Sequence, residues 1–361
     1  MDCPKRYDAM ERLHKLVTLR DFETCSLESM SEYAKSYFSA GACSKSTPRE
    51  NEEAFHRYRI RPRVLRDVSD AEMSCKVLNS HVSCPIGIAP VGLHVLAHQE
   101  AESATAKACC EEDCIFILSS SASTCIERVQ YIVSSLKEIQ PVLWMQTYIH
   151  KERLVTMNII RRAESLGFSA IVVTVDSPNC GLWRNVMPED FFKFVTSKMP
   201  NLPSLPRYLE DASITFEDLK WIVENTKLPV IAKGILSGED AKKAVEIGVS
   251  AIIVSNHGGR LIERVVSTID VLEEVVEAVS HSTIEVYVDG GIRSGSDVFI
   301  SLALGAKGAF IGRPAIWGLS VEGENGVKKV LQILKEELLL TMQLAGASKI
   351  EDIKRSMVVK I

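Results

Sequence analysis

From about residue 84 onward, the sequence alternates short apolar runs with helix-like segments. The apolar runs are rich in β-branched residues and largely free of polar ones, which is typical of parallel strands buried on both faces. Eight strands are expected, at Pro85–Ala89, Cys114–Leu118, Val142–Thr147, Ala170–Val175, Pro229–Lys233, Ala251–Ser255, Glu285–Asp289 and Gly308–Ile311. Eight strands, each followed by a helix, are the elements of a closed (β/α)8 TIM barrel, so this α/β fold is predicted.

Residues 1 to about 75 lack this alternation and predict helices and loops, including a helix over 21–38 that ends at Ser39–Ala42. We interpret them as a helical cap on the barrel. Residues 185–212 contain four prolines after Val186 and little periodicity. They predict an inserted loop over the site.

Beyond Trp317, residues through Ala345 place apolar side chains at helical spacing. This pattern predicts a C-terminal helical extension packed on the outside of the barrel. Residues 1–361 are therefore expected to form one domain, with the barrel and its outer helices over about 84–345.

Charge and composition exclude several kinds of partner. The formal net charge is −5, so the chain has no basic excess for nucleic acid or an anionic membrane. No apolar run approaches the ~20 residues needed to span a bilayer, and the first residues lack a hydrophobic signal core. The ten cysteines are scattered without metal-ligand spacing, which predicts reduced thiols and no metal site. We therefore expect a small-molecule partner.

The segment Ser255–Arg260 follows the apolar run Ala251–Val254 and carries the most informative chemistry. His257 can transfer a proton near neutral pH, and Arg260 offers a planar fork that suits a carboxylate. A (β/α) barrel places its chemistry at the carboxyl ends of its strands, where this segment lies. The alternative is a loop histidine beside a solvated arginine.

Two further glycine- and arginine-containing segments, Val288–Gly295 and Phe310–Pro314, follow the seventh and eighth strands. This is the usual phosphate site of such barrels. Glycines expose backbone N–H groups and arginines add positive charge, so the two loops predict a site for a phosphate monoester. Tight turns with incidental arginines are the alternative.

Together these segments resemble the FMN-dependent α-hydroxy acid oxidases, the family of glycolate oxidase. The similarity extends over nearly the whole chain and includes Tyr37–Ala42, Arg61–Arg63, Ile88–Pro90, Gln146–Tyr148 and Thr174–Pro178. Two segments look closest to the long-chain 2-hydroxy acid oxidase branch: Leu228–Leu236 and Ile316–Leu319.

The resemblance implies catalytic and substrate-binding roles. His257 matches the catalytic base, Asp176 the carboxylate that orients it, and Arg260 the anchor of the substrate carboxylate. Tyr37 and Tyr148 match hydroxyls that line the substrate site.

The resemblance also implies a flavin site. Lys233 matches a catalytic lysine that lies beside the flavin and stabilises its negative charge when reduced. The other residues that match flavin contacts are Ala89, Pro90, Ser119, Gln146, Thr174 and Ser255. The residues that match the ribityl and phosphate end are Asp289, Gly291, Arg293, Gly312 and Arg313.

The implied activity is that of an (S)-2-hydroxy-acid oxidase: FMN-dependent oxidation of a 2-hydroxy acid to a 2-oxo acid, with O2 reduced to H2O2. The resemblance also implies a homotetramer and a peroxisomal location, although Val359–Ile361 match a peroxisomal address only loosely. A cytoplasmic location is the alternative.

Departures from the family pattern leave alternatives open. Trp183 stands where the family has a second substrate arginine, and Arg184 substitutes for it if the loop shifts by one residue. Ser121 replaces a frequent aromatic residue and predicts a roomier pocket for medium or long aliphatic substrates. The alternatives are an FMN-binding homologue with weak or lost catalysis, a dehydrogenase with another electron acceptor, and a phosphate-binding barrel enzyme without flavin.

Overall fold

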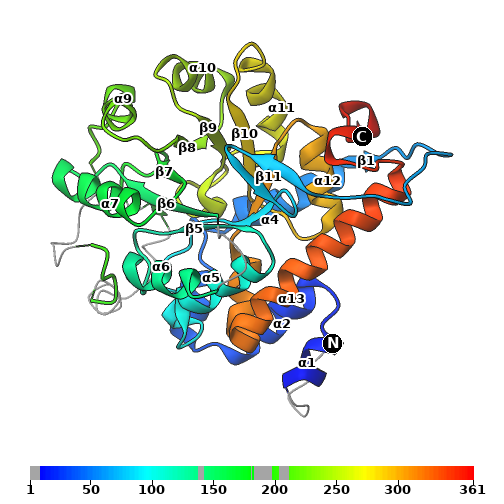
Figure 1. Cartoon of the computed structure of the whole chain (residues 1–361), viewed down its shortest axis with the longest axis horizontal. Coiled ribbons are helices and arrows are strands. Elements are labelled where there is room, and N and C mark those ends of the chain that lie inside the picture. The colour runs from blue at the N-terminus through cyan, green and yellow to red at the C-terminus, as the bar shows by residue number, and fades with distance from the viewer. Residues whose placement is uncertain (1–8, 137–141, 180, 183–196, 203–210) are drawn as a thin grey trace.

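The structure is a computed structural model that describes residues 9–136, 142–179, 181–182, 197–202 and 211–361. Its centre is a closed barrel of eight parallel strands (Figure 1). The strands are β4 (Ile86–Ile88), β5 (Ile115–Leu118), β6 (Leu143–Tyr148), β7 (Ala170–Thr174), β8 (Val230–Ile235), β9 (Ala251–Val254), β10 (Glu285–Asp289) and β11 (Gly308–Ile311). The predicted TIM-barrel fold is therefore confirmed, and each predicted strand is present with small shifts at its ends.

Side chains fill the barrel interior. Trp144, Tyr287 and Phe310 form an aromatic cluster whose ring centroids are 5.5 to 5.8 Å apart. The hairpin of β2 (Cys75–Val77) and β3 (Ser80–Val82) packs on the same interior cluster. It lies at the amino ends of the strands, since Leu78 donates its backbone N–H to Glu285 at the start of β10. The carboxyl ends remain available for the site.

Helices surround the barrel (Figure 1). They are α5 (Ala101–Glu111), α6 (Ile126–Ser134), α7 (Arg153–Ser165), α9 (Phe216–Glu224), α10 (Gly238–Glu246), α11 (Thr268–Ala278) and α12 (Gly295–Ala303). The C-terminal helix α13 (Arg313–Ala345) packs against α5 and α12 as predicted for the extension, but it begins earlier than the sequence indicated. The shorter helical turns are η1 (Ala54–Arg57), η2 (His94–Leu96), η4 (His257–Gly259), η5 (Ile350–Asp352) and η6 (Arg355–Met357).

The N-terminal segment contains α1 (Ala9–Lys15), α2 (Leu19–Ser29), α3 (Glu32–Phe38) and α4 (Ser46–Glu53). The prediction of one helix over 21–38 was wrong, because Met30 is extended and the Ser31 side chain caps a new helix by accepting from the Ala34 N–H. The predicted end near Ser39 is confirmed.

Two contacts fix this segment on the rest of the chain. Helix α2 packs along α13, and α4 packs against the η4 turn that contains His257. In addition, β1 (Tyr58–Ile60) pairs antiparallel with β12 (Val358–Lys360). The N-terminal cap therefore reaches both the outer helices and the carboxyl ends of the barrel strands.

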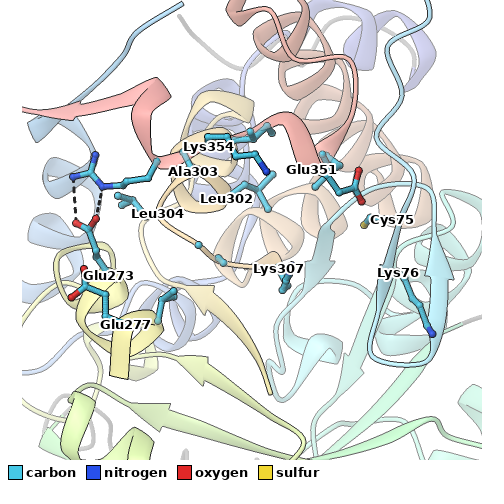
Figure 2. A pocket seen from close by; sticks show the side chains of 16 residues that line it. Cys75, Lys76, Glu273, Glu277, Leu302, Ala303, Leu304, Lys307, Glu351 and Lys354 are labelled. Atoms are coloured by element: carbon cyan, nitrogen blue, oxygen red, sulfur yellow. Dashed lines mark hydrogen bonds and ion pairs between the residues drawn. The ribbon is translucent and has the colours of Figure 1, made fainter. Parts of the chain in front are cut away.

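A groove of about 490 Å³ opens near the amino ends of the strands (Figure 2). Its lining includes Lys307, which precedes β11, together with Cys75 and Glu351, and Arg355 forms an ion pair with Glu273 at its edge. The groove is therefore at the end of the barrel away from His257. Among the described residues, no helix is long and apolar enough to cross a membrane.

Candidate active site

The polar residues predicted for the site gather at the carboxyl ends of the strands. His257 follows β9, and its Nδ1 lies 2.9 Å from Oδ1 of Asp176, which follows β7. Burial alone would raise the pKa of Asp176, but the charge and hydrogen bond of His257, together with Lys233, hold it below its usual range. An ionised Asp176 accepts a hydrogen bond, so it keeps the proton of His257 on Nδ1 and leaves Nε2 as the basic nitrogen.

Lys233 projects from β8 into the barrel mouth and is nearly inaccessible to solvent. Its Nζ donates to Ser255 Oγ at 2.9 Å and forms an ion pair with Asp289 Oδ2 at 3.3 Å. A buried lysine would be costly without such partners. These two partners therefore hold the positively charged ammonium group of Lys233 in a fixed position at the mouth of the barrel.

Gln146 connects the ends of three neighbouring strands. Its Oε1 accepts from the Ser119 hydroxyl at 3.2 Å and from the Ser120 backbone N–H at 3.1 Å. Its Nε2 donates to Thr174 Oγ1 at 3.0 Å. Gln146, Ser119 and Thr174 are all buried, so the structure brings together three of the residues predicted for flavin contact.

Arg260 lies under the N-terminal cap. It donates to the Tyr37 carbonyl oxygen at 2.8 Å, and its guanidinium lies 5.1 Å from the centroid of the Tyr37 ring. Burial lowers the pKa of Arg260, while Tyr37 and Tyr148 oppose this shift. Burial raises the pKa of Tyr37, so its hydroxyl stays protonated and can donate. The structure thus places both predicted tyrosines in the electrostatic neighbourhood of Arg260.

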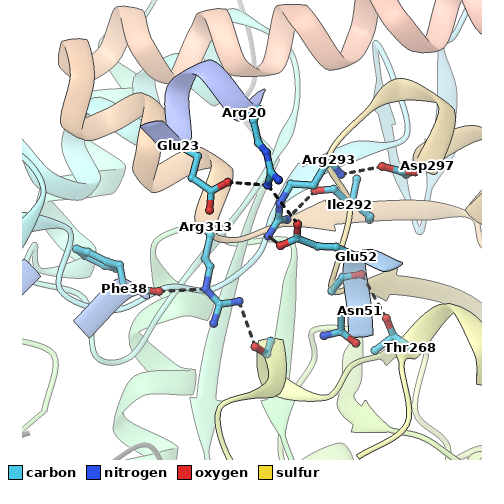
Figure 3. Close-up of polar contacts among 12 residues, drawn as sticks. Arg20, Glu23, Phe38, Asn51, Glu52, Thr268, Ile292, Arg293, Asp297 and Arg313 are labelled. Carbon is cyan, nitrogen blue, oxygen red and sulfur yellow. Dashed lines mark hydrogen bonds and ion pairs between the residues drawn. The ribbon is translucent and has the colours of Figure 1, made fainter. Parts of the chain in front are cut away.

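The loops after β10 and β11 place two more arginines at this end of the barrel (Figure 3). Arg313 donates to the carbonyl oxygens of Phe38, Ala40 and Gly258 at 2.8 to 3.1 Å. Burial, and after it the like charges of Arg260 and Arg293, lower the pKa of Arg313 to about 9. A cluster of partly buried arginines that repel one another favours a bound anion.

Three contacts position the side chain of Arg293. It donates to the Ile292 carbonyl oxygen at 2.9 Å and to Glu52 Oε1 at 2.7 Å, and its guanidinium stacks 4.9 Å from the Trp317 ring centroid. Its Nε and the Oδ1 of Asp289 are buried and have no hydrogen-bond partner within the described parts of the chain. Unpartnered buried donors and acceptors of this kind fit the phosphate and the ribityl hydroxyls of FMN.

The other predicted flavin contacts lie along the same rim. The backbone N–H of Ala89 donates to Ile311, which aligns Ala89 and Pro90 with the end of β11. Gly312 is the N-cap residue of α13, and Gly291 is so close to α4 that a Cβ there would lie 2.0 Å from the Asn51 carbonyl oxygen. Trp183 and Arg184, as well as most of the predicted inserted loop, lie outside the described residues.

Sequence reasoning missed the contribution of α4. The side-chain amides of Asn51 and Asn256 hydrogen-bond to each other in both directions, at 2.9 and 2.7 Å. This pair joins α4 to the loop that carries His257. The partners are 205 residues apart, and no local pattern in the sequence connects them.

Comparisons with known proteins find similar chains over almost the whole length. A peroxisomal (S)-2-hydroxyacid oxidase of Arabidopsis thaliana is 42% identical over 95% of this chain and 96% of its own length. Human 2-hydroxyacid oxidase 1 is 40% identical, covering 96% of this chain and 98% of its own length.

Solved structures with a similar fold also match almost the whole chain. A mutant flavocytochrome b2 with pyruvate bound superposes with a TM-score of 0.88 at 34% identity, covering 96% of this chain and 87% of that one. A mandelate oxidase mutant with (S)-mandelic acid gives a TM-score of 0.84 at 32% identity, covering 94% of this chain and 98% of that one. The profile of the FMN-dependent dehydrogenases matches residues 27–360. This chain is therefore a member of the FMN-dependent dehydrogenase family, a flavoprotein oxidoreductase with FMN as its cofactor.

Proposed function

We propose that this protein oxidises (S)-2-hydroxy acids with medium or long aliphatic chains to 2-oxo acids, and that O2 accepts the electrons and becomes H2O2. The observation that carries the proposal is the 2.9 Å contact between His257 and Asp176 at the same barrel mouth as Arg260. The names of the relatives support the substrate class, since they are 2-hydroxyacid oxidases. Two of the similar structures hold mandelic acid or pyruvate, a 2-hydroxy acid and a 2-oxo acid.

In this proposal His257 is the base. Asp176 holds the proton on Nδ1, so Nε2 accepts a proton from the substrate, and the ionised carboxylate then stabilises the imidazolium. The same base is needed whether the α-hydrogen leaves as a proton or as a hydride. FMN, when bound, supplies the two-electron acceptor.

The remaining residues bind and orient. Arg260 would pair with the substrate carboxylate, and the protonated hydroxyls of Tyr37 and Tyr148 would donate to the substrate. Lys233, fixed by Ser255 and Asp289, would lie beside the flavin, where its charge stabilises the reduced cofactor.

The FMN itself would be held along the rim. The flavin would contact the residues around Gln146, and its phosphate would bind Arg293, Arg313 and the backbone N–H groups near Gly291 and Gly312.

The preference for longer substrates rests on Ser121. A Cβ built on Gly92 would lie 3.0 Å from Ser121 Cβ and 3.4 Å from the Tyr37 hydroxyl, so Ser121 borders the same space as Tyr37. A serine there leaves more room than an aromatic side chain. An apolar chain that fills this room gains about 0.8 kcal/mol per buried methylene.

The test is a series of (S)-2-hydroxy acids of increasing chain length, with oxygen uptake and peroxide formation measured together. The proposal expects kcat/KM to rise from glycolate toward the longer aliphatic acids, with one peroxide formed per oxygen consumed. Turnover with an artificial electron acceptor but without oxygen uptake would support a dehydrogenase and contradict the oxidase proposal.

A specific observation favours weak catalysis as the second candidate: Trp183 stands where the family carries a second substrate arginine. If the missing guanidinium limits turnover, Trp183→Arg lowers KM for the hydroxy acid and raises kcat/KM by about tenfold or more, because a charge-assisted bond to the carboxylate is restored. Steady-state kinetics measure this, with Arg184→Lys in parallel to test whether Arg184 already fills the role. An unchanged kcat/KM in Trp183→Arg would remove this explanation.

We also propose a peroxisomal location, as in the name of the Arabidopsis relative. Val358–Lys360 form β12 and pair with β1, so a fluorescent tag belongs at the N-terminus, where it leaves this pairing intact. Co-localisation with a peroxisomal marker is expected, and diffuse cytoplasmic fluorescence would contradict the proposal.

A further inference from the structure

Glu52 places a negative charge at the end of the site where a phosphate is expected. It lies in the last turn of α4, and its Oε1 accepts from Arg293 at 2.7 Å (Figure 3). We propose that Glu52 competes with the FMN phosphate for Arg293 and so limits how tightly this protein holds its cofactor. The inference rests on the phosphate-binding roles proposed above for Arg293 and Arg313.

The two arginines can still bind a phosphate. A guanidinium has five N–H donors, and each carbonyl oxygen or carboxylate contact described above uses one of them. Arg313 uses three for Phe38, Ala40 and Gly258, and Arg293 uses two, for Ile292 and Glu52. Donors therefore remain on both side chains, including the buried Nε of Arg293. Glu52 therefore leaves donors for a phosphate, but it adds a negative charge beside the place where the negatively charged phosphate would bind.

The charges around Glu52 decide whether it strengthens or weakens the binding of a phosphate. A phosphate monoester bound to Arg293 would bring nearly two negative charges there, and the negative charge of Glu52, which pairs with the same arginine, would repel them. The second cation near Glu52, Arg20, is 4.0 Å away, and 76% of its side chain is exposed, so solvent screens it. Only 31% of the Glu52 side chain is exposed, so its charge is screened less. The net effect on a bound phosphate is unfavourable.

The neighbouring residue offers a matched control. Glu53 is on the same helix and is exposed, and its side chain makes no hydrogen bond or ion pair within the described ranges. Glu53→Gln therefore makes the same change of charge and shape as Glu52→Gln without touching Arg293.

The experiment titrates the apoprotein with FMN and, separately, with riboflavin, which lacks the phosphate, and follows the quenching of flavin fluorescence. For Glu52→Gln we expect the Kd for FMN to fall about five- to tenfold, as for removal of one partly screened like charge. The Kd for riboflavin should stay within twofold, and Glu53→Gln should change neither value.

Three results for Glu52→Gln would overturn the inference: an unchanged Kd for FMN, a higher Kd for FMN, or a Kd for riboflavin that falls as much as the Kd for FMN. The first two would show that Glu52 is neutral or helps by orienting Arg293. If neither the wild type nor Glu52→Gln bound FMN more tightly than riboflavin, the proposed phosphate site itself would fail, and the inference with it. Tight FMN binding that is indifferent to Glu52→Gln would remove the inference alone.

Discussion

His257 occupies a backbone conformation that few residues other than glycine adopt. Its φ is 56°, in the left-handed region, where a side chain costs about 1 kcal/mol or more. The Ser255 hydroxyl accepts from its backbone N–H at 3.2 Å, and Asp176 holds its ring. Strain that the surroundings hold in place is common at catalytic positions, which fits the role proposed for His257.

Asp176→Asn tests that role. The substitution keeps the shape of the side chain but removes the charge that stabilises the protonated imidazole, so kcat should fall about 100-fold or more. Because Asp176 is ionised at neutral pH, its loss also favours the neutral imidazole. The acid limb of the kcat/KM profile should therefore move to lower pH. The pH dependence of kcat/KM measures this, with the flavin spectrum as a control for cofactor content.

An acid limb at the same pH in Asp176→Asn would contradict the proposed coupling. So would a limb that moved to higher pH.

At the residue scale, short motifs predicted much of the candidate site. The structure brings His257, Asp176, Lys233 and Arg260 to one end of the barrel, since Lys233 lies in the second half of β8 and the other three follow the neighbouring strands β7 and β9. Their roles stay predictions. The contacts of Asn51 and Glu52 were not predicted, because their partners are 205 and 241 residues away in the sequence.

At the scale of the elements, a glycine in strand β8 leaves room for the side chain of Asp176. The pairing of β8 with β9 shifts register between Lys233 and Ile235, and Gly234 in between has a φ of 114°. A Cβ on Gly234 would lie 2.6 Å from Asp176 Cβ. The irregularity therefore makes space for the carboxylate that holds His257.

Gly234→Ala should lower both stability and activity. The substitution costs about 1 kcal/mol for the left-handed backbone and a further ~1–3 kcal/mol for the clash, and it displaces Asp176. Gly167→Ala is the matched control, since Gly167 has a φ of 77° and a Cβ added to it would meet nothing within 4 Å. Urea unfolding and kcat measure both effects. Equal losses of kcat in the two variants would contradict a specific support of Asp176 by Gly234.

The strands were predicted well because they are buried on both faces and read as unbroken apolar runs such as Ala251–Val254. Elements without that pattern were missed. Helix α4 contains only charged and polar residues apart from Pro48, and β1 has three residues whose partner β12 lies at the other end of the chain. Such elements form because of tertiary contacts, which local sequence does not record.

At the scale of the whole molecule, the N-terminal cap and α13 connect the site to the outer surface. Helix α2 lies along α13 (Figure 1), which starts directly after the phosphate-binding candidate Gly312. Helix α4 touches the η4 turn. We propose, on this basis, that cap and barrel act as one domain. Denaturant unfolding followed by flavin release and by circular dichroism should then give coincident transitions. Two separated transitions would contradict a single domain.

The homotetramer implied by the family resemblance belongs to the same scale. Light scattering coupled to gel filtration should give four times the 40.0 kDa mass of the chain at micromolar concentration. A monomer mass that persists at high protein concentration would contradict the tetramer.

The central claim is that this FMN protein oxidises 2-hydroxy acids with His257 as the base and Arg260 as the carboxylate anchor. The most direct test is the visible absorbance spectrum of the purified, FMN-loaded protein, recorded before and after a 2-hydroxy acid is added without oxygen. We predict a flavin spectrum that bleaches on addition of the acid and returns when air is admitted. A flavin spectrum that does not change with hydroxy acids of several chain lengths would contradict the claim.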